Sequence, residues 1–224
     1  MENYKGYNIE INQDEYPESP REWDNLGTMY CSHRDYNLGD NNYNSGDELF
    51  ESLAEDYKLY DSDGFYIQDR DKILDEIKKQ AVILPLYIYE HGGITINTGG
   101  YSCRWDSGQV GYIIVSYNDL RDNYNWKNIT KKRIEKIESY LIQEVKTLDD
   151  YFTGNVYAYT TWDKNGIDYI DTCCGFYGSD YEENGLMENV KSSINWHIKK
   201  EQAKKQEQLK TYIKNSVPLE FRWV

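Results

Sequence analysis

One stretch of the chain decides the fold: ILPLYIYEHGGITINTGGYSCRWDSGQVGYIIVS (Ile83–Ser116). It is the most apolar part of an otherwise polar sequence, and glycine pairs at 92–93 and 99–100 divide it. Near-continuous apolar runs that end at glycines are typical of buried strands. The stretch therefore predicts strands over 82–89, 94–97 and 110–116. Pro85 lacks the N–H that a strand donates to its neighbour, so we expect an edge, a bulge or a strand start there.

Other elements are expected to pack against this sheet. Apolar residues three and four apart predict helices, the clearest of which begins after Thr130. Alternating residues predict further strands, two of them joined by Asn165–Gly166, a pair that favours a type I′ turn. The predicted helices are 46–57, 71–81, 130–152 and 186–215, and the other predicted strands are 7–13, 155–162, 167–173 and 217–224.

Together these elements predict an α+β fold. We expect a mixed or antiparallel β-sheet with a β-hairpin near 155–173, packed against helices near 130–152 and 186–214. At 224 residues the chain fits one domain over 1–224. Residues 14–45 are rich in turn-forming residues and predict an irregular N-terminal region. The helix at 186–214 is expected to protrude or bend, because Ala203 is the only apolar residue between 199 and 208.

The chain is strongly acidic, with a formal net charge of −14. Residues 1–80 hold 20 acidic and 8 basic side chains, whereas residues 191–224 hold 3 and 8. A negative field repels nucleic acid and anionic membranes and attracts basic surfaces. We therefore expect no membrane binding, and no direct DNA binding outside the Lys-rich C-terminal helix. The same charge is also typical of proteins in which it serves only solubility.

A candidate partner-binding face lies in the acidic first third of the chain. Glu48, Glu51 and Glu55 follow one side of the helix predicted at 46–57, with spacings of about 4.5–6 Å along its axis. The next predicted helix and the loop before it extend this acidic face. The predicted partner-binding residues are Asp47, Glu48, Glu51, Glu55, Asp56, Asp61, Asp63, Asp69, Asp71 and Asp75.

A second candidate is a group of thiol, imidazole and carboxylate side chains in irregular segments. Cys103 is its candidate nucleophile, with a histidine as base and an aspartate to orient that base. Zinc held by Cys31, His33, His91 and Cys103 is a further alternative, although Cys-x-His with two distant partners matches usual ligand spacing poorly. The alternative site between the 31–40 and 91–108 loops comprises Cys31, His33, Asp40, His91, Cys103, Trp105 and Asp106. The leading prediction is non-enzymatic, with no metal and no cofactor.

The targeting and redox signals in the sequence favour a cytoplasmic location. The first 16 residues lack the apolar core of a signal peptide. No run approaches the roughly 18 apolar residues of a membrane span. The four cysteines form no Cys-x-x-Cys pair, so we expect reduced thiols.

Three short segments occur together in the chain: SPREWDNLGTM (19–29), Cys31-x-His33-Arg34 with Leu38-Gly39-Asp40, and WDSGQVG (105–111). With them the chain resembles a family of small, mostly uncharacterised proteins carried by bacteriophages, prophages and plasmids. The resemblance covers residues 18–178 and carries over no activity. It implies the company of mobile-element accessory proteins, a class rich in inhibitors of host defence.

Charge and resemblance together favour a phage or mobile-element anti-defence protein of the anti-CRISPR or anti-restriction type. Its acidic face would mimic DNA and occupy the basic surface of a nuclease or CRISPR effector in the host cytoplasm. Duplex DNA carries about one charge per 1.7 Å of axis, so mimicry needs several acidic segments side by side. The alternatives are a thiol- or histidine-dependent enzyme or ligand-binding domain at the second site, and a scaffold or assembly accessory of a phage.

The shared segments also have a purely structural interpretation, which we favour over catalysis. They would brace the N-terminal region against the sheet. In this interpretation Trp23 and Trp105 are buried, and Arg21 and Arg34 pair with Asp24, Asp40 or Asp106.

Overall fold

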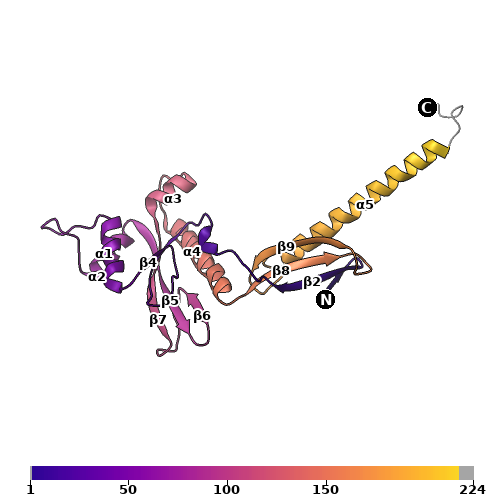
Figure 1. The fold of residues 1–224 in the computed structure, drawn as a ribbon. Coiled ribbons are helices and arrows are strands. Elements are labelled where there is room, and N and C mark those ends of the chain that lie inside the picture. The colour runs from indigo at the N-terminus through magenta and orange to yellow at the C-terminus, as the bar shows by residue number, and fades with distance from the viewer. Residues whose placement is uncertain (1, 217–224) are drawn as a thin grey trace. The chain divides into compact units, whose positions relative to one another are not determined.

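A computed structural model describes residues 2–216, and within them the chain forms two compact units. The central unit comprises residues 18–154, and the terminal unit comprises residues 2–17 and 155–216 (Figure 1). The single domain predicted over 1–224 is divided into two units with separate hydrophobic clusters. The terminal unit contains both ends of the chain, because strands from the two ends pair with each other. The strand predicted at 217–224 lies outside the described residues.

The central unit is built on a five-stranded sheet with the order β4-β3-β7-β5-β6. The strands predicted from the apolar stretch are confirmed as β5 (Ala81–Glu90), β6 (Ile94–Asn97) and β7 (Ser107–Ser116), all antiparallel neighbours. Pro85 lies next to a bulge between Leu86 and Tyr87, and pairing of β5 with β6 begins only at Tyr87. At Pro85, β5 therefore pairs with β7 alone. This position suits proline, because it has no N–H to donate to a second neighbouring strand.

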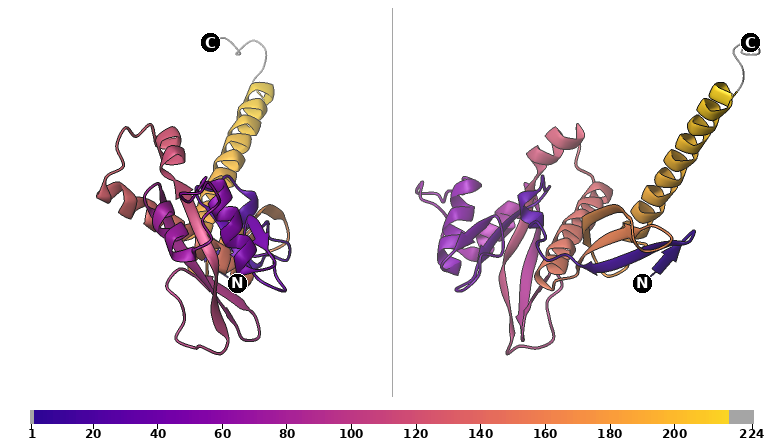
Figure 2. Two further views of the ribbon diagram at one scale, coloured as in Figure 1. Left: turned by 90° about the vertical axis from the view of Figure 1, so that its left-hand side faces the viewer. Right: turned by 45° about the vertical axis from the view of Figure 1, so that its right-hand side comes forward.

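Helices cover both faces of this sheet (Figure 2). On one face lies α4 (Lys131–Phe152), which buries Ile137, Leu141, Val145 and Leu148 as its apolar period predicts. On the other lie α1 (Gly46–Asp56) and α2 (Arg70–Lys78). Alternate residues of β7 serve the two cores, so Ile113 packs in the α4 layer and Ile114 in the α1–α2 layer. The short helix α3 (Tyr117–Tyr124), capped by Ser116, was not predicted.

Residues 14–45 are less irregular than predicted. They contain a 3-10 turn, η1 (Pro20–Glu22), and two strands, β3 (Thr28–Ser32) and β4 (Asn41–Tyr43). The strand β3 runs antiparallel to β7 and parallel to β4, so the sheet is mixed. Residues 29–31 are all buried because both faces of the sheet are covered, so β3 lacks the alternation by which a half-exposed strand is found.

The terminal unit has a four-stranded antiparallel sheet with the order β1-β2-β8-β9. Its strands are β1 (Glu2–Tyr4), β2 (Tyr7–Gln13), β8 (Val156–Trp162) and β9 (Tyr169–Tyr177). The helix α5 (Leu186–Ser216) packs Leu186, Val190 and Ile194 against this sheet. Beyond these contacts, residues 199–216 of α5 are exposed at every position, and Figure 1 shows the helix continuing past the strands. The α+β class, the hairpin and its packing on a helix are confirmed.

The turn of the β8–β9 hairpin differs from the prediction. Gly166 has a positive φ of +71°, but Asn165 does not, so the prediction of a type I′ turn is wrong. The carboxylate of Asp163 instead accepts the N–H groups of Ile167 at 2.8 Å and Asp168 at 3.1 Å, which closes a longer loop. Two successive positive φ values, the requirement of a type I′ turn, occur between β1 and β2 at Lys5 and Gly6.

Candidate functional site

All ten carboxylates predicted to bind a partner are exposed, and they lie on one continuous segment of the central unit. We call them the acidic surface: Asp47, Glu48, Glu51, Glu55, Asp56, Asp61, Asp63, Asp69, Asp71 and Asp75. The segment runs through α1, the connection 57–69 and α2, and the two helices share a hydrophobic core. Burial of Leu49 and Leu53 on α1, and of Ile73 and Ile77 on α2, turns the charged faces outward.

Local hydrogen bonds fix where both acidic helices begin. Ser45 caps α1 by accepting the N–H of Glu48 at 3.2 Å, and the Glu48 carboxylate accepts the N–H of Asn44 at 3.0 Å. This reciprocal pattern satisfies two N–H groups at the helix start. Asp69 caps α2 by accepting the N–H groups of Asp71 and Lys72. An ion pair of 2.5 Å between Asp47 and Arg70 then links α1 to α2.

Six carboxylates of the acidic surface have partners within the central unit. Asp47, Asp69 and Asp75 pair with Arg70, Lys72 and Lys78, while Glu48, Asp56 and Asp61 accept hydrogen bonds. The other four, Glu51, Glu55, Asp63 and Asp71, have neither a hydrogen bond nor an ion pair among residues 2–216. Exposed ion pairs are worth at most about 1 kcal/mol, so the paired carboxylates can still exchange partners.

Cations interrupt this surface. Residues 46–80 hold 11 acidic side chains and five basic ones, Lys58, Arg70, Lys72, Lys78 and Lys79. The unpaired carboxylates are nevertheless spread over both helices and the connection between them. A partner would therefore meet a mixed surface with an acidic excess, rather than a uniform row of charges.

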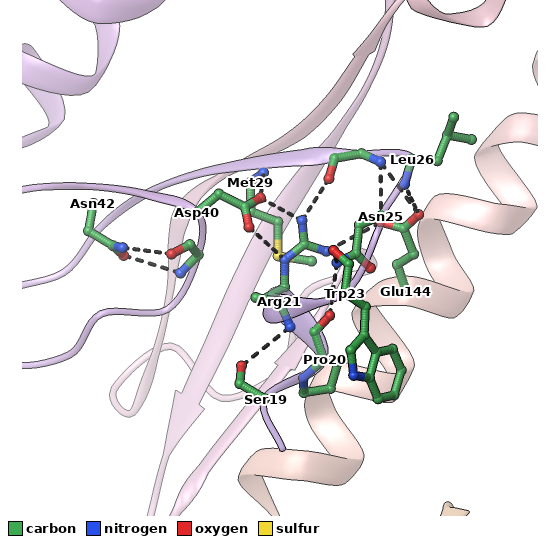
Figure 3. A network of polar contacts seen from close by, with 12 residues as sticks. Ser19, Pro20, Arg21, Trp23, Asn25, Leu26, Met29, Asp40, Asn42 and Glu144 are labelled. Carbon is green, nitrogen blue, oxygen red and sulfur yellow. Dashed lines mark hydrogen bonds and ion pairs between the residues drawn. The ribbon is translucent and has the colours of Figure 1, made fainter. Parts of the chain in front are cut away.

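The seven residues of the alternative site divide into separate local groups, two of which are structural. Cys31 is fully buried between β7 and β4, and burial raises the pKa of its thiol to about 12, which makes it inert. Asp40 is held by Arg21, whose Nε donates to Oδ1 at 3.0 Å and whose Nη2 donates to Oδ2 at 2.5 Å (Figure 3). Asp40 also accepts the N–H of Met29 at 2.7 Å.

Arg21 is the centre of a buried polar network that joins the 19–29 segment to the 38–40 segment. Its side chain is 9% exposed and also donates to the Gly27 carbonyl at 2.6 Å and to Glu144 of α4 at 3.3 Å. Glu144 in turn accepts the N–H of Leu26 at 2.8 Å (Figure 3). The network ties residues 19–29 and 38–40 to α4 and β3, as the structural interpretation predicts.

Three details of that interpretation are wrong. Trp23 is 42% exposed and Trp105 is 95% exposed, so neither is buried. Arg34 pairs with its neighbour Asp35 at the surface, because the side chain lies on the outside of the 33–36 turn. The brace is made by Arg21 and by hydrogen bonds of Asn25 to the Pro20 and Trp23 carbonyls.

His33 is held by hydrogen bonds on both sides of its ring. Its Nδ1 accepts the N–H groups of Asp35 and Tyr36, both at 3.2 Å, so the proton resides on Nε2. Nε2 donates to the Glu90 carboxylate at 2.8 Å. The contact brings the 31–40 loop to the end of β5, but it leaves no ring nitrogen of His33 available as a base.

Cys103, Asp106 and His91 form the remaining group. The Cys103 thiol lies 3.7 Å from the Asp106 carboxylate, and the same carboxylate oxygen lies 3.6 Å from Nδ1 of His91. A nucleophilic thiol needs a base that takes its proton, usually an imidazole in hydrogen-bond contact with the sulfur. Here the carboxylate stands between thiol and imidazole, so the order of groups is not that of a thiol enzyme. No set of three or more His, Cys, Asp or Glu side chains within residues 2–216 is arranged to hold a metal ion.

Sequence reasoning missed the acidic partners that arrive from distant elements. Glu90 is hydrogen-bonded to His33, Glu144 accepts a hydrogen bond from Arg21, and Asp149 accepts the N–H of Ile96 on β6 at 2.8 Å. It also missed the exposed aromatic residues Tyr60 and Phe65 between the acidic helices. Their signal was present, since aromatic residues flank Asp61-Ser62-Asp63-Gly64, a sequence typical of a tight turn.

Comparisons of the chain with family models, with curated proteins and with solved structures find no match. Among the helices of residues 2–216, none combines the length and apolarity that crossing a membrane requires.

Proposed function

We propose that the chain is a non-enzymatic anti-defence protein of a phage or mobile element. In this proposal the acidic surface binds the basic nucleic-acid-binding surface of a host nuclease or CRISPR effector, in the host cytoplasm. The observation that carries it is the exposure of all ten carboxylates on one continuous segment of a folded unit. Carboxylates held on two capped helices can meet a basic groove with little loss of conformational freedom.

The geometry favours imitation of a DNA surface by several elements rather than by one helix. Along α1 the charges of Glu48, Glu51 and Glu55 are about 4.5–6 Å apart along the axis, which is sparser than duplex DNA at one charge per about 1.7 Å. Asp63 on the connection and Asp71 on α2 add charges beside that row. Binding of this kind weakens steeply with salt, because counterions compete for the same cations.

The Cys103 group supports the enzymatic alternative poorly. Its carboxylate contacts both the thiol and the imidazole, and among the described residues no imidazole contacts a thiol. The thiol is therefore left without the base that nucleophilic catalysis requires. The acidic surface needs no such assembly, since attraction to a basic partner depends only on exposed charge.

A plasmid-interference assay tests the proposal. Bacteria that carry a CRISPR nuclease or a restriction endonuclease are transformed with a targeted plasmid, with and without this protein. We expect wild type to restore transformation, and Glu51→Lys with Glu55→Lys to lower that protection at least tenfold. The matched control is Asp122→Lys with Glu135→Lys, which makes the same charge change at exposed carboxylates of α3 and α4.

The control pair should protect as well as wild type. The proposal fails if wild type protects against no nuclease of either type. The acidic surface is the wrong surface if the α1 pair, folded as judged by circular dichroism, protects as well as wild type.

A further inference from the structure

The connection between α1 and α2 is a closed loop with a defined conformation. Asp61 and Phe65 are joined by a backbone hydrogen bond of 2.7 Å, and Leu59 accepts the N–H of Ile67 at 3.0 Å. Inside the loop, the Asp61 carboxylate accepts the N–H groups of Asp63 at 2.9 Å and Phe65 at 3.0 Å. Gly64 takes a positive φ of +85°, which glycine adopts without strain.

Aromatic stacking stabilises the same loop from outside. The rings of Tyr60 and Tyr66 are stacked with centroids 4.9 Å apart, and their backbones form a bridge across the loop. Leu59 is buried in the core beneath α1 and α2, so the base of the loop is anchored. Figure 1 shows the segment projecting from the ends of these two helices.

This loop holds a large apolar side chain in solvent. Phe65 is 72% exposed and Tyr60 is 52% exposed, although the unit has a core a few residues away. Single exposed apolar residues are common and need no explanation. Two exposed aromatic rings on one hydrogen-bonded loop are a different case, because aromatic anchors on a preorganised segment are typical of the energetic centres of protein interfaces.

The charges around the rings define the partner. Among residues 2–216 the Asp63 carboxylate has no partner, and the Asp61 carboxylate closes the loop by accepting two backbone N–H groups. Phosphate groups of nucleic acids or of anionic lipids would be repelled by this rim. A protein with an apolar pocket bordered by Lys or Arg fits both features, since those cations can pair with the carboxylates and lie over the ring faces.

We propose that Phe65 is the anchor by which the acidic surface binds its partner, a basic protein with an apolar pocket rimmed by cations. This inference rests on the proposed function and adds a residue and a pocket to it. The carboxylates then govern the association rate and its salt dependence, while Phe65 governs how long the complex lasts.

Site-specific photo-cross-linking in cells carrying the nucleases tests this. The full chain carries p-benzoylphenylalanine at one position, in the variants Phe65→p-benzoylphenylalanine, Glu51→p-benzoylphenylalanine and, as the control, Glu135→p-benzoylphenylalanine. We expect positions 65 and 51 to capture the same basic, nucleic-acid-binding protein, and position 135 to capture none. Excess unlabelled wild type should abolish both adducts, and Phe65→Ala should compete at least tenfold less well. Ile142→Ala, which shortens an exposed apolar side chain on α4, should compete as wild type does.

The other outcomes separate the two proposals. An adduct at 51 without one at 65, or undiminished competition by Phe65→Ala, overturns the anchor and leaves the proposed function standing. An adduct at 65 with a protein that is not basic also overturns the anchor. No adduct at either position overturns both.

Discussion

Gly111 on β7 lies so close to Tyr30 on β3 that a β-carbon at Gly111 would overlap the Tyr30 carbonyl oxygen. Gly111 pairs with Cys31 on one side and with Leu86 of β5 on the other. The glycine therefore lies in the middle of the sheet, where a side chain would push β3 away. Loss of β3 would also displace the Arg21–Asp40 contact, because Asp40 accepts the N–H of Met29 on that strand.

Gly111→Ala should destabilise the protein by about 3 kcal/mol, the upper end of the usual cost of overpacking. Urea unfolding followed by circular dichroism measures the change. Gly108→Ala is the matched control, because it lies in the same strand and its β-carbon would meet nothing within 4 Å. The control should change the stability by no more than about 0.5 kcal/mol. Equal effects at the two positions would contradict the close approach.

Arg21→Lys should destabilise the protein by about 3 kcal/mol. Lysine keeps the charge but lacks the planar fork that donates to Asp40, Glu144 and the Gly27 carbonyl together. At least one of the two carboxylates would then be left partly buried without a cationic partner, the situation that makes breaking a buried pair costly. Arg34→Lys provides the control, since Arg34 pairs with Asp35 in solvent and should cost less than about 1 kcal/mol. A similar loss of stability for both variants would mean that the buried network contributes no more than the exposed Arg34–Asp35 pair.

What the sequence could predict depends on the range of each interaction. The central strands and α4 follow from apolar patterns within single segments, and so does the outward direction of Glu51 and Glu55. The Arg21–Glu144 contact joins residues 123 positions apart, and no local pattern encodes it. The prediction of a type I′ turn at Asn165–Gly166 is wrong for a different reason. The Asp163 carboxylate accepts two N–H groups, and these bonds override the preference of Asn-Gly for a type I′ turn. The exposure of Trp105 has no local signal either, because tryptophan is usually buried.

The four thiols should differ in reactivity. Burial raises the pKa of Cys31 to about 12, so almost none of it is thiolate at pH 8. Cys174 is exposed, and Cys103 and Cys173 are half-buried. Iodoacetamide labelling followed by mass spectrometry should modify Cys174 first and leave Cys31 unmodified until the protein is unfolded in urea. Early modification of Cys31 in the native protein would show that β3 opens readily.

Asp149 of α4 should make the stability of the central unit depend on pH in an unusual direction. Burial raises the pKa of its carboxyl, although the hydrogen bond from the Ile96 N–H acts in the opposite direction. A carboxyl with a raised folded pKa binds its proton more tightly in the folded state. Its contribution to stability is therefore full below the unfolded pKa of about 3.9 and is lost as the pH rises through the raised value.

Asp149→Asn keeps an oxygen that accepts the Ile96 N–H and removes the buried charge. At pH 7 it should be at least as stable as wild type, and its advantage should shrink as the pH is lowered towards 4. Asp149→Ala removes the acceptor as well and leaves an N–H of β6 unpaired, so it should cost about 1 kcal/mol relative to Asn at pH 7, 5.5 and 4 alike. Urea unfolding of the three proteins at pH 7, 5.5 and 4 measures both differences. An Asn variant that is less stable than wild type at pH 7, with the deficit growing as the pH rises, would show that the charge of Asp149 stabilises the contact between α4 and β6.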